Sequence, residues 1–578
     1  MTQARAVQLC DWDSPLNPTF NSWTTVNLAE VFPGVAHPFD ATWYHRWQTN
    51  CFRALFARLD ISDLMPLYEF PIPNFLGFWA GQCAANVSFT TAFVSAYQTG
   101  AGSSVVEQFF TADEKGAHTA ATAADTERAS QLRTRVLRIW GQLPRSAVAM
   151  RGTVRRLVDR VEGQDLSGLP EPVLIRQFAR VEALAQRTFT QHILTSFAAG
   201  EQASMLGDLL RSAGVEDEDA VLALTSAIGD VESAEPPEAL WALSRWVRAQ
   251  PGLAARFSPL STDEITRYLD VPPDTAWASL AARVRGFLEA YGHRGPEWML
   301  SLPDWAEDPA VPLNSLRAMV QAADSDGPDR RRAGAAGERE AAVERYRTRL
   351  PARRRARFDS LVDRAQRFVR LRERTKATCV MGLRPGRQIL LALGEHFHAR
   401  GVLDSADDIF YLFANEVDAV VDGRLTKDEA RNAVRRRRRQ KIEMEAYLLP
   451  DNFEGRPEIQ LRGEAPEPSS VLQGLGVSPG LVTGRARVMA DLAAAGETPI
   501  HPGEVLVAPF TDAPWTPLFL TAAAVVVETG GMLSHAATVA REFGIPAVVM
   551  VKDATRLIET GEELTVDGRT GRVVVAAG

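Results

Sequence analysis

The stretch that decides the fold of the C-terminal region is ETGGMLSHAATVAREFGIPAVV, Glu528–Val549. It begins where the β-rich run AAVVVE ends, and two glycines follow after Thr529. Ser534 is a favourable N-cap for a helix that begins with His535, and Gly544 followed by Pro546 is typical of a helix end. The pattern therefore predicts a strand, a tight turn and a capped helix with a histidine in its first turn.

The position of His535 predicts its chemistry. Gly530 and Gly531 lack a Cβ atom, so the backbone can turn sharply and let a bulky anion approach. The helix N-terminus offers unpaired N–H groups and a partial positive charge, which disfavours imidazolium and favours a bound phosphoryl group. A neutral imidazole nitrogen is a nucleophile. A histidine that only begins or packs a helix is the alternative interpretation.

The residues around this stretch predict a small β-rich domain. ARVM (Ala486–Met489), EVLVAPF (Glu504–Phe510) and AVVMV (Ala547–Val551) are short apolar runs, and ELTVDGRTGRVVV (Glu563–Val575) is typical of a hairpin. Residues 463–474, which begin GEAPEPSSV, have the composition of a linker. Eight such residues reach about 25 Å when extended, far enough for a following domain to swing. We therefore expect a domain at 475–578.

The preceding residues, 1–462, are rich in Ala, Leu, Arg and Glu with apolar residues at helical spacing, and they predict a mostly helical domain. The charged stretch Asp324–Glu340 is expected to be an exposed loop before a long basic helix. The fold class is therefore predicted to be α+β: a large, mostly α-helical domain followed by a C-terminal β/β/α domain.

Length and composition narrow the class of protein. The 578 residues exceed a single hydrophobic core, and the net charge of −8 argues against a general nucleic-acid binder. The four cysteines are scattered, which predicts neither a zinc site nor a disulfide framework. The N-terminus lacks the apolar core of a signal peptide, so a cytoplasmic location is expected.

One stretch, Phe70–Val106, contains no charged residue. Its apolar part is long enough to span a bilayer, but polar residues interrupt it and Pro71 and Pro73 precede it. A buried core segment is therefore the favoured interpretation, and no membrane association is expected. Together with Trp43, Trp47 and Trp79, the stretch is a candidate lining for an apolar substrate pocket.

Three motifs in order resemble the mobile domain of the phosphoenolpyruvate-utilising enzymes. They are LGVSPGLVTGRARV (Leu475–Val488), PFTDAPWTPLF (Pro509–Phe519) and the stretch around His535. The resemblance implies a swivelling domain in which His535 accepts phosphate. It also implies that Gly530, Gly531, Ser534, Thr511, Asp512 and Trp515 shape the surroundings of the histidine. The alternative for Asp512 and Trp515 is a helix cap and a packing residue.

The helical part resembles rifampin phosphotransferase-like proteins in WTTVNLAEVFPGVAHPF (Trp23–Phe39), YGHRGPEWMLSLPDWAEDP (Tyr291–Pro309) and the segments Arg367–Lys376 and Leu390–Val417. Arg372 and Lys376 are four apart on a predicted helix and share a face, where two cations can clamp a phosphoryl group. The resemblance implies that they face the phosphohistidine; a solvated basic face is the alternative. A second group, a candidate substrate contact or structural ion-pair network, is formed by His293, Arg294 and Glu297.

The sequence lacks the ATP-grasp domain that precedes these parts in the family, and it contains no GxxxxGK[ST] motif. The first hypothesis is therefore a split phosphotransferase. A separate ATP-grasp partner, using ATP and Mg²⁺, would phosphorylate His535, and the domain would swing to pass the group to a hydroxyl of a small, apolar organic substrate. No permanently bound cofactor or metal is expected in this chain.

Two other hypotheses remain open. The second is a donor-independent dehydratase or isomerase of a natural-product intermediate, with His535 as general acid or base. The third is a protein that only binds a hydrophobic small molecule. This hypothesis gives no physical reason for a histidine at that turn.

Overall fold

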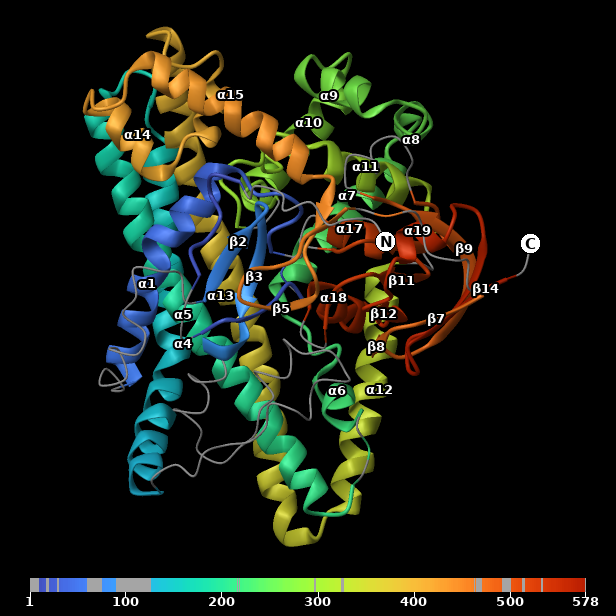
Figure 1. Cartoon of the computed structure of the whole chain (residues 1–578). Coiled ribbons are helices and arrows are strands. Elements are labelled where there is room, and N and C mark those ends of the chain that lie inside the picture. The colour runs from blue at the N-terminus through green and yellow to red at the C-terminus, as the bar shows by residue number, and fades with distance from the viewer. Residues whose placement is uncertain are drawn as a thin grey trace. The chain divides into compact units, whose positions relative to one another are not determined.

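A computed structural model describes residues 10–16, 20–26, 28, 31–59, 75–89, 126–215, 217, 219–295, 298–323, 327–461, 463, 470–490, 500–511, 515–531 and 534–576. The chain forms two compact units (Figure 1). Unit 1 comprises Met1–Ser204, Trp298–Leu302 and Arg374–Gly463, and unit 2 comprises Met205–Glu297, Pro303–Glu373 and Glu464–Gly578. Each unit is a group of residues that contact one another. The units do not test the domain bounds predicted at 462 and 475, which stay a prediction.

Unit 1 is built from long helices and a small sheet. Its sheet is antiparallel in the order β2-β3-β1-β5, with β1 Ser22–Thr24, β2 Leu76–Trp79, β3 Gln82–Asn86 and β5 Asn452–Glu454. A second pair consists of β4 Tyr447–Leu448 and β6 Gln460–Leu461. The helices are α1 Pro38–Leu59, α4 Thr126–Glu162, most of α5 Glu171–Arg211, the second half of α13 Ala352–Ala399, η4 Ala406–Tyr411, α14 Ala414–Val421 and α15 Lys427–Met444.

The uncharged stretch contributes core residues to unit 1 where the structure describes it, at 75–89. Strands β2 and β3 form a hairpin whose residues are almost all buried, which confirms a core segment for this part. Trp43 and Trp47 pack against each other on α1, and Trp79 packs against Trp23. All three predicted pocket tryptophans are thus buried in aromatic contacts. The apolar pocket itself stays a prediction.

Unit 2 combines a group of helices with the C-terminal sheet. The helices before the sheet are α6 Ala220–Thr225, η2 Glu232–Ala234, α7 Glu235–Ala249, α8 Leu253–Phe257, α9 Thr262–Asp270, α10 Thr275–Tyr291, α11 Ala310–Gln321, α12 Pro328–Arg349 and the first half of α13. Within the described residues, the short helices that accompany the sheet are α17 Thr516–Phe519, α18 His535–Phe543 and α19 Ala554–Leu557.

The sheet of unit 2 has eight strands in the order β7-β14-β13-β9-β10-β11-β12-β8. They are β7 Val471–Gln473, β8 Leu475–Ser478, β9 Leu481–Val488, β10 Val505–Ala508, β11 Ala524–Val527, β12 Ala547–Val549, β13 Glu563–Asp567 and β14 Arg572–Val575. The four strands β9 to β12 pair in parallel, and the remaining pairs are antiparallel. The predicted β-rich runs and the terminal hairpin are therefore confirmed.

The central strands are buried on both faces. Leu506, Val525 and Val527 belong to a core with residues of α7, α10, α11, α17 and α18. Val505 and Val526, which alternate with them, belong to a second core that includes residues of α19. Because side chains alternate across a strand, helices must cover both faces of such an apolar parallel sheet. One hydrophobic core thus runs from the helices of unit 2 into the face that carries α18.

The expectation of an exposed loop at Asp324–Glu340 is wrong for most of that stretch. Helix α12 already begins at Pro328, so most of this stretch is helical. Proline is favourable in the first helical turn, where its missing N–H needs no partner. The charged, small residues that indicated a loop belong to the beginning of that helix.

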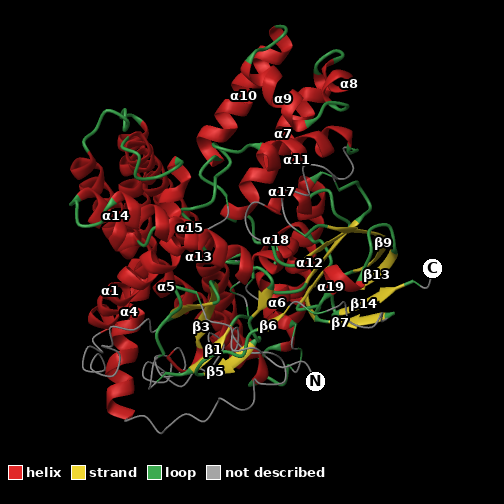
Figure 2. Cartoon of the chain, turned by 45° about the horizontal axis from the view of Figure 1, so that its top comes forward, coloured by secondary structure: helices red, strands yellow, loops and turns green. Residues whose placement is uncertain are grey.

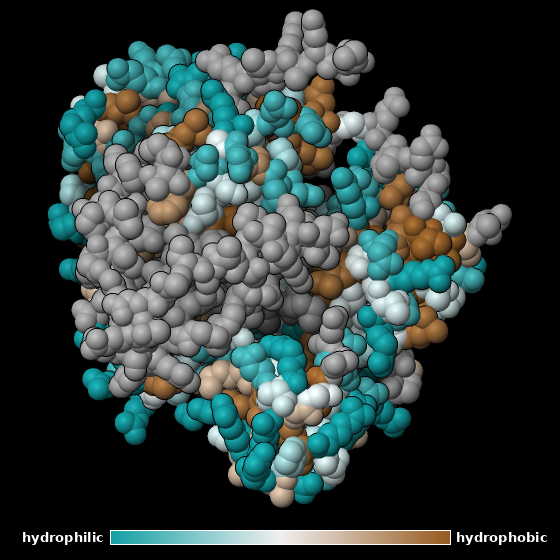
Figure 3. Space-filling model, turned by 60° about the horizontal axis from the view of Figure 1, so that its bottom comes forward, coloured by the Kyte–Doolittle hydropathy of each residue, from teal (hydrophilic) through white to brown (hydrophobic). Residues whose placement is uncertain are grey.

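The predicted α+β class is confirmed: helices prevail, and the β-rich region with its covering helices is C-terminal (Figure 2). On the face drawn in Figure 3, the described surface carries hydrophilic residues with smaller apolar patches between them. Among the described helices, none combines the length and the apolarity that a membrane crossing requires.

Candidate functional site

The strand–turn–helix around His535 forms as predicted. β11 ends at Val527, and Gly530 has a φ of +125°, a backbone conformation that favours glycine. The Ser534 hydroxyl accepts a hydrogen bond from the Ala537 N–H at 3.2 Å and caps α18. Gly544, with φ +61°, ends the helix in the left-handed conformation. His535 is thus the first residue of a capped helix.

The imidazole of His535 is held by its own domain. Its Nε2 lies 2.9 Å from the Thr516 hydroxyl oxygen, and either atom can be the donor, according to the tautomer of the ring. The Phe519 ring contacts the imidazole edge-on, with 6.2 Å between the ring centres. His535 is only 5% exposed. The ring therefore has a fixed orientation but is closed to solvent in this arrangement.

The motif Pro509–Phe519 reaches the histidine through Thr516, the residue after Trp515. Thr511 and Trp515 are fully buried, and within the described part of the chain neither the Thr511 hydroxyl nor the Trp515 indole N–H has a hydrogen-bond partner. Trp515 packs against Phe510 at 6.2 Å between ring centres. The predicted Asp512 lies outside the described residues.

The other end of α18 binds the helices of unit 2. The Glu542 carboxylate is 2% exposed, accepts a hydrogen bond from the Gly229 N–H at 3.0 Å, and lies 3.3 Å from the Arg332 guanidinium on α12. Burial raises the pKa of Glu542, although Arg332 and the backbone N–H groups oppose this shift. A nearby bond joins the Arg331 guanidinium to the Ala522 carbonyl at 3.0 Å.

Arg372 lies in the same unit, close to Arg541 of α18. Its guanidinium donates to Glu373 at 3.1 Å, and Glu373 accepts a second hydrogen bond from Ser233 at 3.3 Å. Burial, together with the like charge of Arg372, lowers the pKa of Arg541 to about 10, and Glu373 opposes this shift. Arg372 and Glu373 thus act electrostatically on Arg541, in the helix that carries His535.

Arg372 and Lys376 are both on α13, as the spacing predicts. Lys376 is partly buried and belongs to unit 1, where its neighbour Thr375 contacts His192 at 3.1 Å. That the pair clamps a phosphoryl group stays a prediction.

The segment after α10 contacts η2. Arg294 is 3% exposed and donates to the Glu232 carbonyl at 3.3 Å, and its own carbonyl accepts from the Trp305 N–H at 2.7 Å. These two bonds join Arg294 to backbone groups, and the predicted substrate contact or ion-pair network stays a prediction. His293 is partly buried, and Glu297 lies outside the described residues.

Several residues near His535 or at the other end of α18 were not predicted from the sequence. They are Thr516, Ser233, Glu373, Arg541, Glu542 and Arg332. Thr516 lies within a recognised motif, and its hydroxyl could have been proposed as a partner of His535. The Glu542–Arg332 pair joins residues about 200 positions apart, which no local pattern indicates.

Two family models match the chain. The rifampicin phosphotransferase fourth domain matches residues 192–373, and the mobile domain of PEP-utilising enzymes matches residues 500–571. Neither model describes an ATP-grasp domain. The first match ends at Glu373, where the helical part of unit 2 also ends.

Curated relatives include a rifampicin phosphotransferase of Streptomyces sviceus, 29% identical over 75% of this chain and 51% of its own length. The prodigiosin synthesizing transferase PigC of Serratia marcescens is 33% identical over 61% of this chain and 40% of its own length. Chondramide synthase cmdD of Chondromyces crocatus is 31% identical over 60% of this chain and 9% of its own length. This chain therefore spans about half or less of these relatives. Through these two domains, the chain is a relative of the rifampicin phosphotransferases and the PEP-utilising enzymes.

Proposed function

We propose that this chain is a phosphotransferase component that carries a phosphoryl group on His535. The observation that carries this proposal is the placement of His535 as first residue of a capped helix after a Gly530 turn. The N–H groups and the positive end of α18 favour a phosphoryl anion there. The matches to the mobile domain and to rifampicin phosphotransferases support the same function.

In the first step, an imidazole nitrogen of His535 attacks a phosphorus atom of ATP held by a separate ATP-grasp partner with Mg²⁺. An N–P bond forms, and the leaving phosphate group keeps the electrons of the broken P–O bond. In the second step, a substrate hydroxyl attacks the phosphorus, the N–P bond breaks, and the hydroxyl proton goes to solvent or a base. Arg372 and Lys376 would offset the charge on the transferred group.

The burial of His535 supports a movement during this cycle that exposes the imidazole. A side chain that is 5% exposed cannot meet a donor on another protein. In this proposal the phosphohistidine domain leaves the helices of unit 2 for the first step and returns, or docks elsewhere, for the second. A small, apolar organic alcohol is the proposed acceptor, in keeping with the tryptophan-rich N-terminal region.

The test is incorporation of label from ATP, labelled at the β or γ position, in the presence of a candidate ATP-grasp partner. We expect acid-labile, base-stable label on the wild type and on His501→Ala, because His501 is an exposed histidine of the same domain. His535→Ala should carry none. Absence of label on the wild type, with substrate turnover still dependent on His535, would overturn the relay and favour donor-independent acid–base catalysis.

A further inference from the structure

Unit 2 contains a cavity of about 730 Å³ next to the C-terminal end of α18. One wall comes from α6 and α12, and the other from residues 476–482, the end of α18 and the turn at Gly568–Arg569. The volume is that of a typical small-molecule site, which holds about 300–1,000 Å³. Arg541, which lines it, follows His535 by six residues, about 9 Å along the helix axis. The cavity is therefore separate from the phosphohistidine site.

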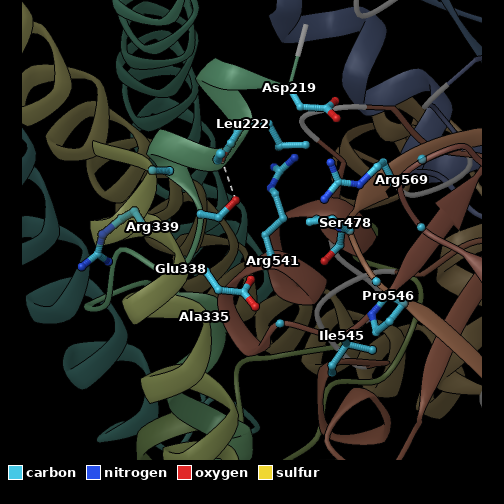
Figure 4. A pocket seen from close by; sticks show the side chains of 18 of the residues that line it. Asp219, Leu222, Ala335, Glu338, Arg339, Ser478, Arg541, Ile545, Pro546 and Arg569 are labelled. Carbon is cyan, nitrogen blue, oxygen red and sulfur yellow. Dashed lines mark hydrogen bonds between the residues drawn. The ribbon is translucent and has the colours of Figure 1, made fainter. Parts of the chain in front are cut away.

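The lining carries more positive than negative charge. Five arginines and three carboxylates contribute to it: Arg331, Arg339, Arg345, Arg541 and Arg569, with Asp217, Asp219 and Glu338. In Figure 4, the guanidinium groups of Arg541 and Arg569 point into the same part of the cavity, whereas Arg339 points away. The end of α18 adds about half a negative charge, too little to reverse this balance. The cavity thus favours an anion.

Arg541 adds a positive charge to this lining. It is partly buried, and although burial and the like charge of Arg372 lower its pKa to about 10, with Glu373 opposing the shift, it stays protonated at neutral pH. A second guanidinium, that of Arg569, converges on it from another segment (Figure 4). Two guanidinium groups that point into the same part of a cavity offer several N–H donors and positive charge to a phosphate anion.

Ser478 supplies a second, independent indication of a ligand. Its side chain is 1% exposed, lines the cavity, and has no hydrogen-bond partner among the described residues. A buried hydroxyl without a partner costs about 1–3 kcal/mol, which a ligand oxygen would recover. Beside it, an apolar wall is formed by Leu222, Leu481, Ile545 and Pro546.

We propose that this cavity binds a phosphomonoester that carries an apolar organic group. Its phosphoryl oxygens would accept from Arg541, Arg569 and Ser478, because paired guanidinium groups match the geometry and charge of a phosphate dianion. The organic group would lie on the apolar wall. Since α12 and the phosphohistidine domain both line the cavity, a bound ester stabilises their docked arrangement and regulates access to His535.

The experiment is calorimetric titration of the full chain with 1-naphthyl phosphate and, separately, with inorganic phosphate. We expect saturable binding of one naphthyl phosphate, and weaker binding of inorganic phosphate, which lacks the apolar group. Arg541→Gln and Arg569→Gln should each weaken binding by about tenfold or more. Arg569 is exposed, so its variant is expected to fold even if the Arg541 variant does not.

Two controls define the site. Arg572→Gln alters an exposed arginine of the same sheet that does not line the cavity, and His535→Ala alters the phosphohistidine site; both should bind as the wild type does. No saturable binding, or binding that neither cavity variant weakens, would overturn the site. Equal affinity for inorganic phosphate would overturn the organic ester and leave free phosphate as the ligand. Loss of binding in His535→Ala would place the ester at the histidine instead.

Discussion

The two ends of helix α18 differ in what they contact. At its beginning, His535 is bound by Thr516 and contacts Phe519, both from its own domain. At its end, Glu542 is bound by Gly229, in the connection between α6 and η2, and by Arg332 of α12. The hydrogen bond to Thr516 therefore stays within the C-terminal segment, although α17, which supplies Thr516, also packs against α7 and α11. A short helix of 9 residues can thus couple chemistry to docking.

The largest expected effect is a loss of phosphoryl transfer that leaves the docking contacts of α18 intact. His535→Ala should lower phosphoryl transfer by at least about a thousandfold, as the loss of a nucleophile does. Docking should persist, because none of the Glu542 contacts involves His535. Steady-state turnover and hydrogen exchange of α18 measure the two quantities. Loss of protection across α18 in this variant would show that the ends are not independent.

The Glu542 end of α18 is expected to govern the protection of α12 and α18 from hydrogen exchange rather than the phosphoryl transfer itself. Glu542→Ala removes the buried acceptor of the Gly229 N–H and one of the two carboxylates beside Arg332, which keeps Glu238, so the cost is about 1–3 kcal/mol. Hydrogen exchange of α12 and α18 should accelerate, and labelling of His535 by the partner should become faster because the histidine is more accessible. A double-mutant cycle with Arg332→Ala checks the pair. Strictly additive losses would contradict a direct interaction.

Thr516→Val tests how far the orientation of the imidazole matters. The valine keeps the shape but removes the hydroxyl that lies 2.9 Å from Nε2. We expect about a tenfold slower phosphorylation of His535, since a misplaced reacting group loses part of its effective concentration. Thr521→Val, in the same segment, is the matched control and should leave the rate unchanged. Equal rates for all three proteins would remove Thr516 from the site.

The cap of α18 gives a smaller, purely structural effect. Ser534→Ala removes the hydrogen bond to the Ala537 N–H and should lower the free energy of unfolding by about 1 kcal/mol. Denaturant unfolding measures this loss. Ser534→Asp, which can also cap, should restore the stability; a failure to do so would indicate that the hydroxyl acts through another contact.

The pH dependence of docking should be the mildest effect. The pKa of Glu542 is raised above its ordinary 4.5 when docked, so the docked state binds the proton more tightly. This contribution is fully present below pH 4.5 and is lost as the pH rises through the raised pKa. Docking should therefore strengthen on acidification over that range, and Glu542→Gln should abolish the trend. Weaker docking of the wild type at the lower pH would contradict the sign.

What the sequence predicts well is local. Ser534, Gly544 and Pro546 define the bounds of α18, and the β-rich runs define the strands, because caps, turns and strand propensity act over a few residues. The motif at Pro509–Phe519 also identified the segment that contacts His535, although Thr516 itself was missed.

What the sequence does not predict depends on distant contacts. The parallel order of β9 to β12 and the Glu542–Arg332 pair join segments whose separation leaves no periodic signal. The beginning of α12 was missed for a different reason: small and charged residues resemble a loop, and packing against α18 determines the helix instead. Arg372 was placed on a helix correctly, but its proximity to Arg541 is a property of the fold.

The most direct measurement is the residue-level location of the phosphoryl group. The protein would be treated with ATP and a candidate ATP-grasp partner, kept at alkaline pH, digested, and sequenced by tandem mass spectrometry. We predict one phosphorylated residue, His535, in the peptide that also contains Ser534. Phosphate on another residue, or an unmodified His535 in protein that turns over substrate with ATP, would contradict the account.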